Sequence, residues 1–272
     1  MQGSDQPAGE RRLAGGKLIY DEPAENVARL RIVNPEKRGA LDHEILDAFA
    51  HEVPLIQARC LIVTGTGKVF SAGYDIGALP ADRFAEAAEK LVAHPFAEAI
   101  TAIERFAYPT IAALNGHTIG GGLELALACD LRVCAGAAEL GMPPAKLGLV
   151  YGHAGLDKFI QTIGPARTSE LFYSAININA EKALQWGLVN DVRDADEVAD
   201  AALALAATIA GNAPLSLSGN KQVIRTLLTH APIDPAVEAE LVELRRSCFL
   251  SEDFREGVRA FGEKRPPRWT GR

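Results

Sequence analysis

Two glycine-bearing segments, each placed after an apolar run, constrain this chain more than any other feature. They are residues 70–76, FSAGYDI, and residues 119–125, IGGGLEL, which follow the apolar runs 60–63 and 110–114. Glycine lets the backbone turn tightly and approach a ligand closely, with main-chain N–H groups directed outward. The pattern predicts two strand ends whose N–H groups converge on one oxygen atom, as stabilisation of an enolate requires.

Composition is that of a globular protein with a sizeable core. Of the 272 residues, 48% are apolar and 23% are charged, and the net charge is -7. A negative charge argues against nucleic acid or an anionic membrane as the main partner. Residues 1–16 are polar and lack the apolar centre of a signal peptide. No apolar run reaches the roughly 18 residues that span a bilayer, so we expect a cytoplasmic protein without a membrane partner.

The four cysteines indicate neither a metal site nor a disulfide framework. They are scattered at positions 60, 129, 134 and 248, with no CxxC pair and no matching histidine spacing. Three of them lie in apolar runs, which is typical of buried, reduced thiols. The sequence therefore predicts no metal and no separate cofactor.

The order of apolar patterns predicts an α/β core followed by helices. Strands are expected over 17–20, 27–33, 60–63, 110–114 and 130–135, with a turn over 21–26. Helices are expected over 42–52, capped by Asp42, and over 81–106, 121–128, 155–163, 166–174, 180–186, 197–210, 213–229, 235–250 and 251–264. We expect a flexible segment (1–16), a core (17–210) and a helical C-terminal region (211–272), with helices alone after position 155.

Five ordered stretches of this chain resemble the enoyl-CoA hydratase/isomerase (crotonase) family. They are residues 34–41, 70–76, 115–130, 144–148 and 251–265. The resemblance covers nearly the whole chain from position 17. It implies a crotonase-like spiral of ββα units, a C-terminal helical trimerisation region and a coenzyme A thioester as substrate.

The resemblance assigns the oxyanion hole to the backbone N–H groups of Tyr74 and Gly121. It also places one of the two glutamates of the family's hydratases at Glu124, in the first turn of a predicted helix. A carboxylate there is favoured by the helix dipole as well, which gives a simple structural alternative. If burial raises its pKa, Glu124 can exchange a proton with the substrate or with water.

The second hydratase glutamate is absent from this sequence. Its position, directly after Pro143 and four residues before Gly148, is occupied by Pro144. Because proline carries no proton to transfer, the usual two-carboxylate addition of water cannot operate unchanged. Pro144 and Tyr151 together resemble the methylmalonyl-CoA decarboxylase-like members of the family. His153 is an alternative replacement for the lost acid.

Several further residues correspond to coenzyme A contacts in the family. Lys37, Arg38 and Ala40 match the positions that hold the phosphates and the adenine edge, and the backbone of Ala72 matches the contact to the adenine amine. The other matched substrate-binding positions are Asp75, Ile76, Pro144, Phe261 and Lys264. Phe261 and Lys264 lie on the last helix, which in some members reaches the nucleotide of a neighbouring subunit. Asp75, Asp130 and His117 also have structural interpretations, as residues that hold loops.

These assignments favour an acyl-CoA enzyme that generates or quenches a thioester enolate. Decarboxylation of a malonyl-type CoA is chemically economical, because loss of carbon dioxide forms the enolate without a base. Hydration or double-bond isomerisation by Glu124 alone is the alternative within the lyase and isomerase chemistry of the family. A protein that binds CoA esters without turnover is the alternative of another class. We expect a homotrimer or a dimer of trimers, acting in fatty acid metabolism.

Overall fold

The computed structural model describes residues 9–75, 92–147, 150–229 and 251–272, together with 236–237, 239–240, 242–243 and 247; of the side chains at 258, 261 and 262 nothing is said. The predicted helices over 81–106 and 235–250 therefore lie partly outside the described residues. Ile76 and Cys248 lie outside them as well.

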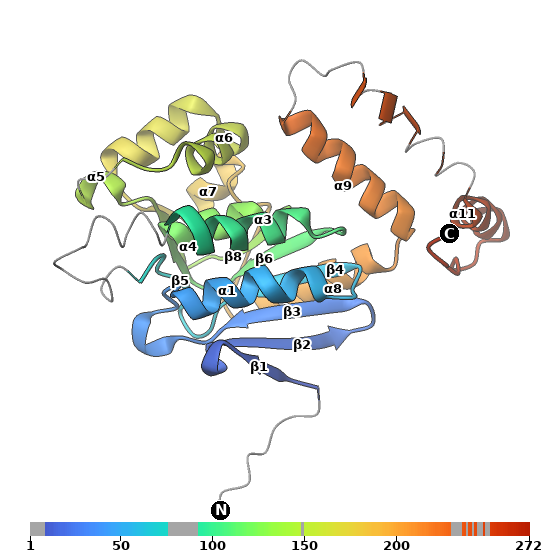
Figure 1. Cartoon of the computed structure of the whole chain (residues 1–272), viewed down its shortest axis with the longest axis horizontal. Coiled ribbons are helices and arrows are strands. Elements are labelled where there is room, and N and C mark those ends of the chain that lie inside the picture. The colour runs from blue at the N-terminus through green and yellow to red at the C-terminus, as the bar shows by residue number, and fades with distance from the viewer. Residues whose placement is uncertain are drawn as a thin grey trace, which may run out of the picture.

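A seven-stranded sheet forms the base of the fold, in the order β1-β2-β3-β4-β6-β8-β11 (Figure 1). Its strands are β1 (Arg11–Leu13), β2 (Leu18–Ala24), β3 (Val27–Ile32), β4 (Cys60–Thr64), β6 (Thr110–Leu114), β8 (Leu131–Ala135) and β11 (Asp191–Arg193). The pairs from β3 to β11 are parallel, whereas β1, β2 and β3 pair antiparallel. All five residues of β6 are buried, as expected of a central parallel strand covered on both faces.

A second sheet of four short strands has the order β10-β9-β7-β5. The strands are β5 (Val69–Ser71), β7 (His117–Ile119), β9 (Glu139–Gly141) and β10 (Ile178–Asn179). The chain alternates between the sheets: β4 is followed by β5, β6 by β7, and β8 by β9. These repeated turns form the predicted crotonase-like spiral.

Nine α-helices have their bounds within the described part of the chain. They are α1 (His43–Glu52), α3 (Ala97–Arg105), α4 (Gly121–Ala128), α5 (Pro144–Leu147), α6 (His153–Ser174), α7 (Ala180–Trp186), α8 (Val198–Ala210), α9 (Pro214–Thr229) and α11 (Glu252–Glu263). Single turns of other helix types are η1 (Ala14–Gly16), η2 (Pro35–Lys37), η3 (Val53–Leu55) and the π-helical η6 (Val92–Phe96). The side chain of Asp42 accepts a hydrogen bond from Ile45 N at 3.0 Å, which confirms the predicted cap of α1.

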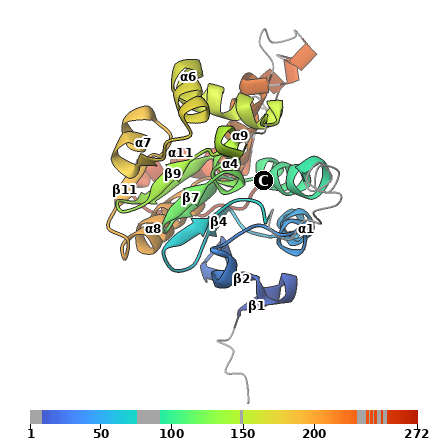
Figure 2. The same cartoon turned by 90° about the vertical axis from the view of Figure 1, so that its left-hand side faces the viewer.

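Helix α4 occupies the centre of the molecule, between the small sheet and α6. It contacts β5, β7, α3 and α6, and Figure 2 shows it beside β7 with α6 above. All of its residues except Leu127 are buried. A site carried by α4 is therefore held by elements on several sides.

Three predictions about secondary structure were wrong. The segment expected to be flexible over 1–16 contains strand β1, which is ordered by its pairing with β2. The turn expected over 21–26 is shorter, because β2 continues to Ala24 with an irregularity in its pairing to β3. An ion pair of 2.6 Å between Asp21 and Arg29 ties these two strands together. The region after position 155 is not helical alone, since it supplies β10 and β11 as edge strands of the two sheets.

The two helices after α7 differ in how they meet the core. Helix α8 packs against β4, β6 and β8. The chain bends by 106° between α8 and α9 (Figure 1). In the described residues, no single helix is long and apolar enough to cross a membrane; α8 and α9 meet that length and composition only as a bent pair. The buried residues of α8, including Ala202 and Ala206, identify it as a core helix.

The C-terminal tail folds back along α11. Thr270 N donates to Asp253 Oδ1 at 2.6 Å, and Trp269 Nε1 donates to the carbonyl of Gly211, between α8 and α9, at 2.6 Å. The tail thereby fixes α11 to the start of α9. Figure 1 places this assembly at the far side of the molecule from α5 and β5.

Candidate active site

The two glycine-bearing turns predicted from the sequence lie against each other. Gly73 has a φ of +90°, and a Cβ atom there would lie 2.9 Å from the carbonyl oxygen of Ile119 and 3.0 Å from the nitrogen of Gly121. Only glycine permits both this backbone conformation and this close approach. The end of β5 and the start of α4 therefore form one continuous surface of backbone.

The N–H groups of Tyr74 and Gly121 donate no hydrogen bond to any other residue in the described part of the chain. Leu41 pairs with this segment on its other side, through Leu41 N to Gly73 O at 2.7 Å and Asp75 N to Leu41 O at 3.0 Å. Gly121 is the first residue of α4, so its N–H has no acceptor within the helix. Both predicted oxyanion donors are thus available to a ligand.

Glu124 lies one turn further along α4 and is only 6% exposed. The hydroxyl group of Tyr151 donates a hydrogen bond to Oε2 of Glu124 at 2.5 Å. Burial raises the pKa of the Glu124 carboxyl group above its usual value, and the hydrogen bond from Tyr151 opposes that rise. A carboxyl group in this state exchanges protons nearer neutral pH than an exposed glutamate does.

Tyr74 extends the chain of hydrogen bonds. Its hydroxyl oxygen lies 3.4 Å from that of Tyr151. Each hydroxyl has a single proton, and Tyr151 gives its own to Glu124, so Tyr74 is the donor to Tyr151. Burial, together with the negative charge of Glu124, raises the pKa of both tyrosines, which keeps both hydroxyl groups protonated at neutral pH.

The aromatic rings of these tyrosines are fixed by packing. The Tyr74 ring meets that of Phe96 edge to face, with ring centroids 4.7 Å apart. The Tyr151 ring meets that of Phe172 in the same way at 5.6 Å. Contacts of this kind orient a ring and therefore the hydroxyl group that it carries.

Gly155 is a residue that the sequence reasoning missed. A Cβ atom at this position would lie 2.8 Å from Oε2 of Glu124 and 2.6 Å from Cε1 of Tyr151. The first turn of α6 therefore touches both members of the hydrogen-bonded pair. A glycine early in a helix is a weak signal by itself, because helix starts accept glycine for many reasons.

The predicted coenzyme A residues of the first half of the chain lie in a second group beside the oxyanion donors. Ala72 N donates to Arg38 O at 3.1 Å, and Lys37 Nζ lies 3.0 Å from Asp75 Oδ2. Ala40 is buried, whereas Lys37 and Arg38 are exposed. The Asp75 contact fits its structural interpretation, since it ties η2 to the first turn.

The remaining predicted residues lie elsewhere. Pro144 is buried at the start of α5, and His153 is exposed at the start of α6. His117 Nδ1 accepts a hydrogen bond from Glu139 N at 3.1 Å, in line with its structural interpretation. Lys264 is exposed after the end of α11, and Figure 1 shows α11 on the far side of the molecule from β5. The side chain of Phe261 lies outside the described residues.

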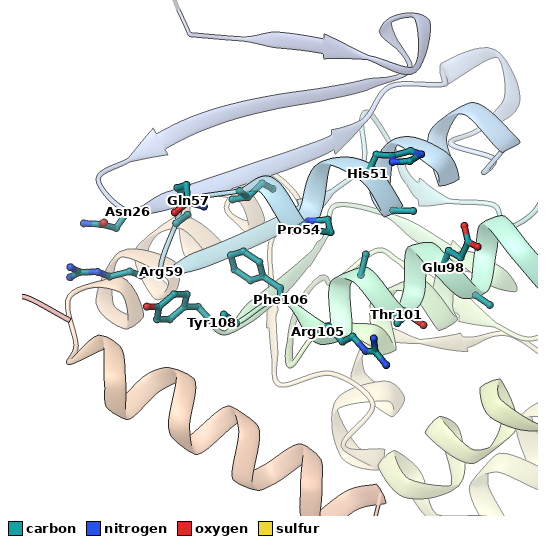
Figure 3. A pocket seen from close by; sticks show the side chains of 16 residues that line it. Asn26, His51, Pro54, Gln57, Arg59, Glu98, Thr101, Arg105, Phe106 and Tyr108 are labelled. Atoms are coloured by element: carbon teal, nitrogen blue, oxygen red, sulfur yellow. The ribbon is translucent and has the colours of Figure 1, made fainter. Parts of the chain in front are cut away.

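A pocket of about 920 Å³ lies between α3 and the segment from α1 to η3 (Figure 3). Side chains that line it include His51, Arg59, Glu98, Arg105 and Tyr108. It contains none of the predicted site residues. This pocket is therefore separate from the candidate site.

The described residues contain no group of three or more His, Cys, Asp or Glu side chains placed to hold a metal ion. Asp130, whose side chain accepts from Thr110 N at 2.8 Å, holds the end of α4 to β6. Cys60, Cys129 and Cys134 are buried free thiols, as predicted.

Comparisons with known proteins show the family and the fold of this chain. The model of the enoyl-CoA hydratase/isomerase family matches residues 22–272. Carnitinyl-CoA dehydratase of Escherichia coli K12 is 38% identical over 220 residues, which are 79% of this chain and 83% of that protein. The crystal structure of an enoyl-CoA hydratase/isomerase family protein from Hyphomonas neptunium matches this chain with a TM-score of 0.86 and 31% sequence identity. The match covers 94% of this chain and 98% of that chain. The structure of DspI from Pseudomonas aeruginosa matches with a TM-score of 0.82 and 31% sequence identity. That match covers 99% of this chain and 100% of the DspI chain.

Proposed function

Because the chain belongs to the enoyl-CoA hydratase/isomerase family, whose members act on CoA thioesters, we propose that it decarboxylates a malonyl-type acyl-CoA. One observation carries the proposal: the only acid–base pair formed at the site by described residues is Glu124 with Tyr151, and position 144 holds proline. Such a site provides one carboxyl proton and lacks the second carboxylate that activates water.

The chemistry needs few groups. The bond between the α-carbon and the substrate carboxylate breaks, carbon dioxide leaves, and the electron pair forms an enolate on the thioester. The N–H groups of Tyr74 and Gly121 stabilise the enolate oxygen. Glu124, in its protonated form, delivers a proton to the α-carbon, and a proton from solvent then restores it. In the overall reaction, the malonyl-type acyl-CoA and one proton are converted to carbon dioxide and an acyl-CoA.

The raised pKa of Glu124 supports its role as the proton donor to the α-carbon. A neutral carboxyl group does not repel the substrate carboxylate, whereas an ionised one does. Tyr151, with Tyr74 behind it, holds the Glu124 side chain and offers a second hydroxyl near the departing group. The same features suit protonation of an enolate better than attack by water.

The assay uses malonyl-CoA and methylmalonyl-CoA with the purified protein in D₂O. The proposal expects release of carbon dioxide and an acyl-CoA product that carries one deuterium at the α-carbon. Glu124→Gln, which removes the proton donor, is the matched control. Product formation at the same rate by this variant contradicts the role of Glu124, and no product from either thioester contradicts the decarboxylase.

Hydration or dehydration is the second candidate, favoured by the 38% identity to carnitinyl-CoA dehydratase. It requires Glu124 to serve as both base and acid. Turnover of crotonyl-CoA or 3-hydroxybutyryl-CoA, with none of the malonyl thioesters, supports this reading instead. Binding of acyl-CoA with no turnover of any of these substrates supports a non-catalytic CoA-ester-binding protein.

We also propose that the chain assembles as a homotrimer or a dimer of trimers. Helix α9 exposes the large apolar side chains of Ile224, Leu227 and Leu228, and exposed apolar surface of this kind is typical of an interface. Helix α11, which Lys264 follows, lies on the far side of the molecule from β5 (Figure 1), so a coenzyme A site shared by these two regions needs a neighbouring subunit. Sedimentation at micromolar concentration measures the assembly, and a monomer would contradict it.

A further inference from the structure

A series of ion pairs runs behind the active site, from α6 to α9. Lys158 Nζ of α6 lies 2.9 Å from Glu104 Oε1 of α3, and Glu104 Oε2 lies 3.2 Å from Arg225 Nη2 of α9. Asp130, at the end of α4, lies 2.8 Å from the buried Lys221 of α9 and 3.9 Å from Arg225. Three helices and the end of α4 are therefore joined by alternating charges.

Lys158 lies one helical turn after Gly155, the residue of α6 in contact with Glu124. Residues three apart in a helix lie on the same face, so the ammonium group of Lys158 is held on the side of α6 that faces α4. The side chains of Lys158 and Glu104 are 20% and 21% exposed. Solvent screens charges at this depth less than it screens charges at the surface.

The two charges act on Glu124 in opposite directions. After burial and the Tyr151 hydrogen bond, the next influences on the pKa of Glu124 are the Lys158 ammonium, which lowers it, and the Glu104 carboxylate, which raises it. Tyr74 acts through Tyr151, and Arg225 lies beyond Glu104. The groups that act on Glu124 directly come from the segment before α6 (Tyr151), from α6 (Lys158) and from α3 (Glu104), while Tyr74 follows β5 and Arg225 belongs to α9.

We propose that Lys158 and Glu104 are positioning residues that set the electrostatic field at the Glu124 carboxyl group, with Arg225 holding Glu104 in place. The inference rests on the proposed function only in taking Glu124 as the group that transfers a proton. These ion pairs link the packing of α9, the first helix of the C-terminal region, to Glu124 on α4.

The test separates the two charges by the sign of their effects. Lys158→Met removes the positive charge and is expected to raise the midpoint of the Glu124 titration. Glu104→Gln removes the negative charge, leaves Lys158 in place, and is expected to lower it. A shift on the order of one pH unit is expected for a single charge near a partly buried carboxyl group. A purely structural role predicts no opposition between the two variants.

Two readouts are used on the full-length protein. One is the pH profile of kcat on the substrate that the protein turns over. The other is the infrared band of the protonated Glu124 carboxyl group, identified by its absence in Glu124→Gln, which titrates without any turnover. If no substrate is turned over but the band midpoints shift in opposite directions, the proposed function fails and this inference stands.

The matched control is Lys182→Met. Lys182 pairs with Glu170 at 2.7 Å, also between α6 and a neighbouring helix, but the two side chains are 41% and 54% exposed. This variant is expected to leave the midpoint in place. Circular dichroism checks the fold, and Lys158→Gln repeats the test if the methionine variant does not fold. Midpoints that equal that of the wild type in both variants, or that shift in one common direction, overturn the inference.

Discussion

The hydroxyl group of Tyr151 lies 2.5 Å from Oε2 of Glu124, across 27 positions of the sequence. The donor comes from the segment before α6 and the acceptor from α4, so the pair exists only when these helices are packed together. Tyr74 adds a third oxygen 3.4 Å from Tyr151.

Tyr151→Phe removes the donor to Glu124 and keeps the ring that packs on Phe172. We expect kcat for the malonyl-type substrate to fall by about 3- to 10-fold, because a hydrogen bond to a neutral group contributes ~0.5–1.5 kcal/mol. The loss of that bond also raises the pKa of Glu124 further. Tyr173→Phe, on the exposed surface of α6, is the control. Equal kcat for Tyr151→Phe and wild type would exclude a role for this hydroxyl group.

Gly155→Ala tests the contact of α6 with the pair. Its Cβ atom would meet Oε2 of Glu124 at 2.8 Å, so the carboxyl group or the helix has to move. We expect kcat to fall by more than about tenfold, with a loss of stability of roughly 1–3 kcal/mol typical of overpacking. Gly152→Ala is the matched control, because no atom lies within 4 Å of its Cβ position. Kinetics and thermal unfolding of both variants are compared.

Gly121→Pro removes one oxyanion donor, and Gly121→Ala serves as its control. Proline is tolerated at the first position of a helix. Both variants place a Cβ atom near the Tyr74 ring, 2.9 Å from Cε1, but only alanine keeps the N–H group. We expect turnover by the proline variant to be lower than that by the alanine variant by about 10²–10³. Similar rates in the two variants would show that this N–H does not bind the enolate oxygen.

Hydration of crotonyl-CoA by the wild-type protein is expected to be slow. Water needs a carboxylate to accept its proton while the α-carbon receives another, and position 144 holds proline. General acid–base assistance contributes about 10²–10⁴ per group. The comparison is with an enoyl-CoA hydratase that has both glutamates, assayed by loss of the enoyl absorbance. A comparable rate would mean that another residue, with His153 as the first to test, has replaced the missing glutamate.

Glu124→Gln is expected to change how stability depends on pH. The folded-state pKa of Glu124 is raised, so the folded protein binds more protons than the unfolded chain between the two pKa values. The contribution of the protonated carboxyl group is complete below the unfolded pKa and is lost as pH rises through the folded one. Urea unfolding at pH 4–8 is expected to show a smaller decrease of stability with rising pH in the variant. An unchanged slope would contradict the raised pKa.

Local patterns were sufficient for the elements whose signals lie within one segment. The strand over 110–114 and the helix over 121–128 were predicted with the bounds that the structure has. The apolar residues of this strand follow one another in the chain, as do the glycines that begin the helix. The cap of α1 is local as well, because Asp42 accepts a hydrogen bond from Ile45 N, three residues further along. The short strands β5, β7 and β9 were missed because each has three residues and is stabilised by pairing with distant strands.

The sequence by itself determined which chemical groups are present: two glycine-bearing turns, one glutamate on α4, and proline in place of a second carboxylate. It also pointed to Tyr151 as a compensating residue. Only the tertiary structure decided that Gly73 lies against Gly121, that Tyr151 donates to Glu124, and that Lys158 and Glu104 meet behind them. Contacts between residues far apart in the chain depend on how helices pack on the sheets, and no local pattern encodes the position of one helix against another.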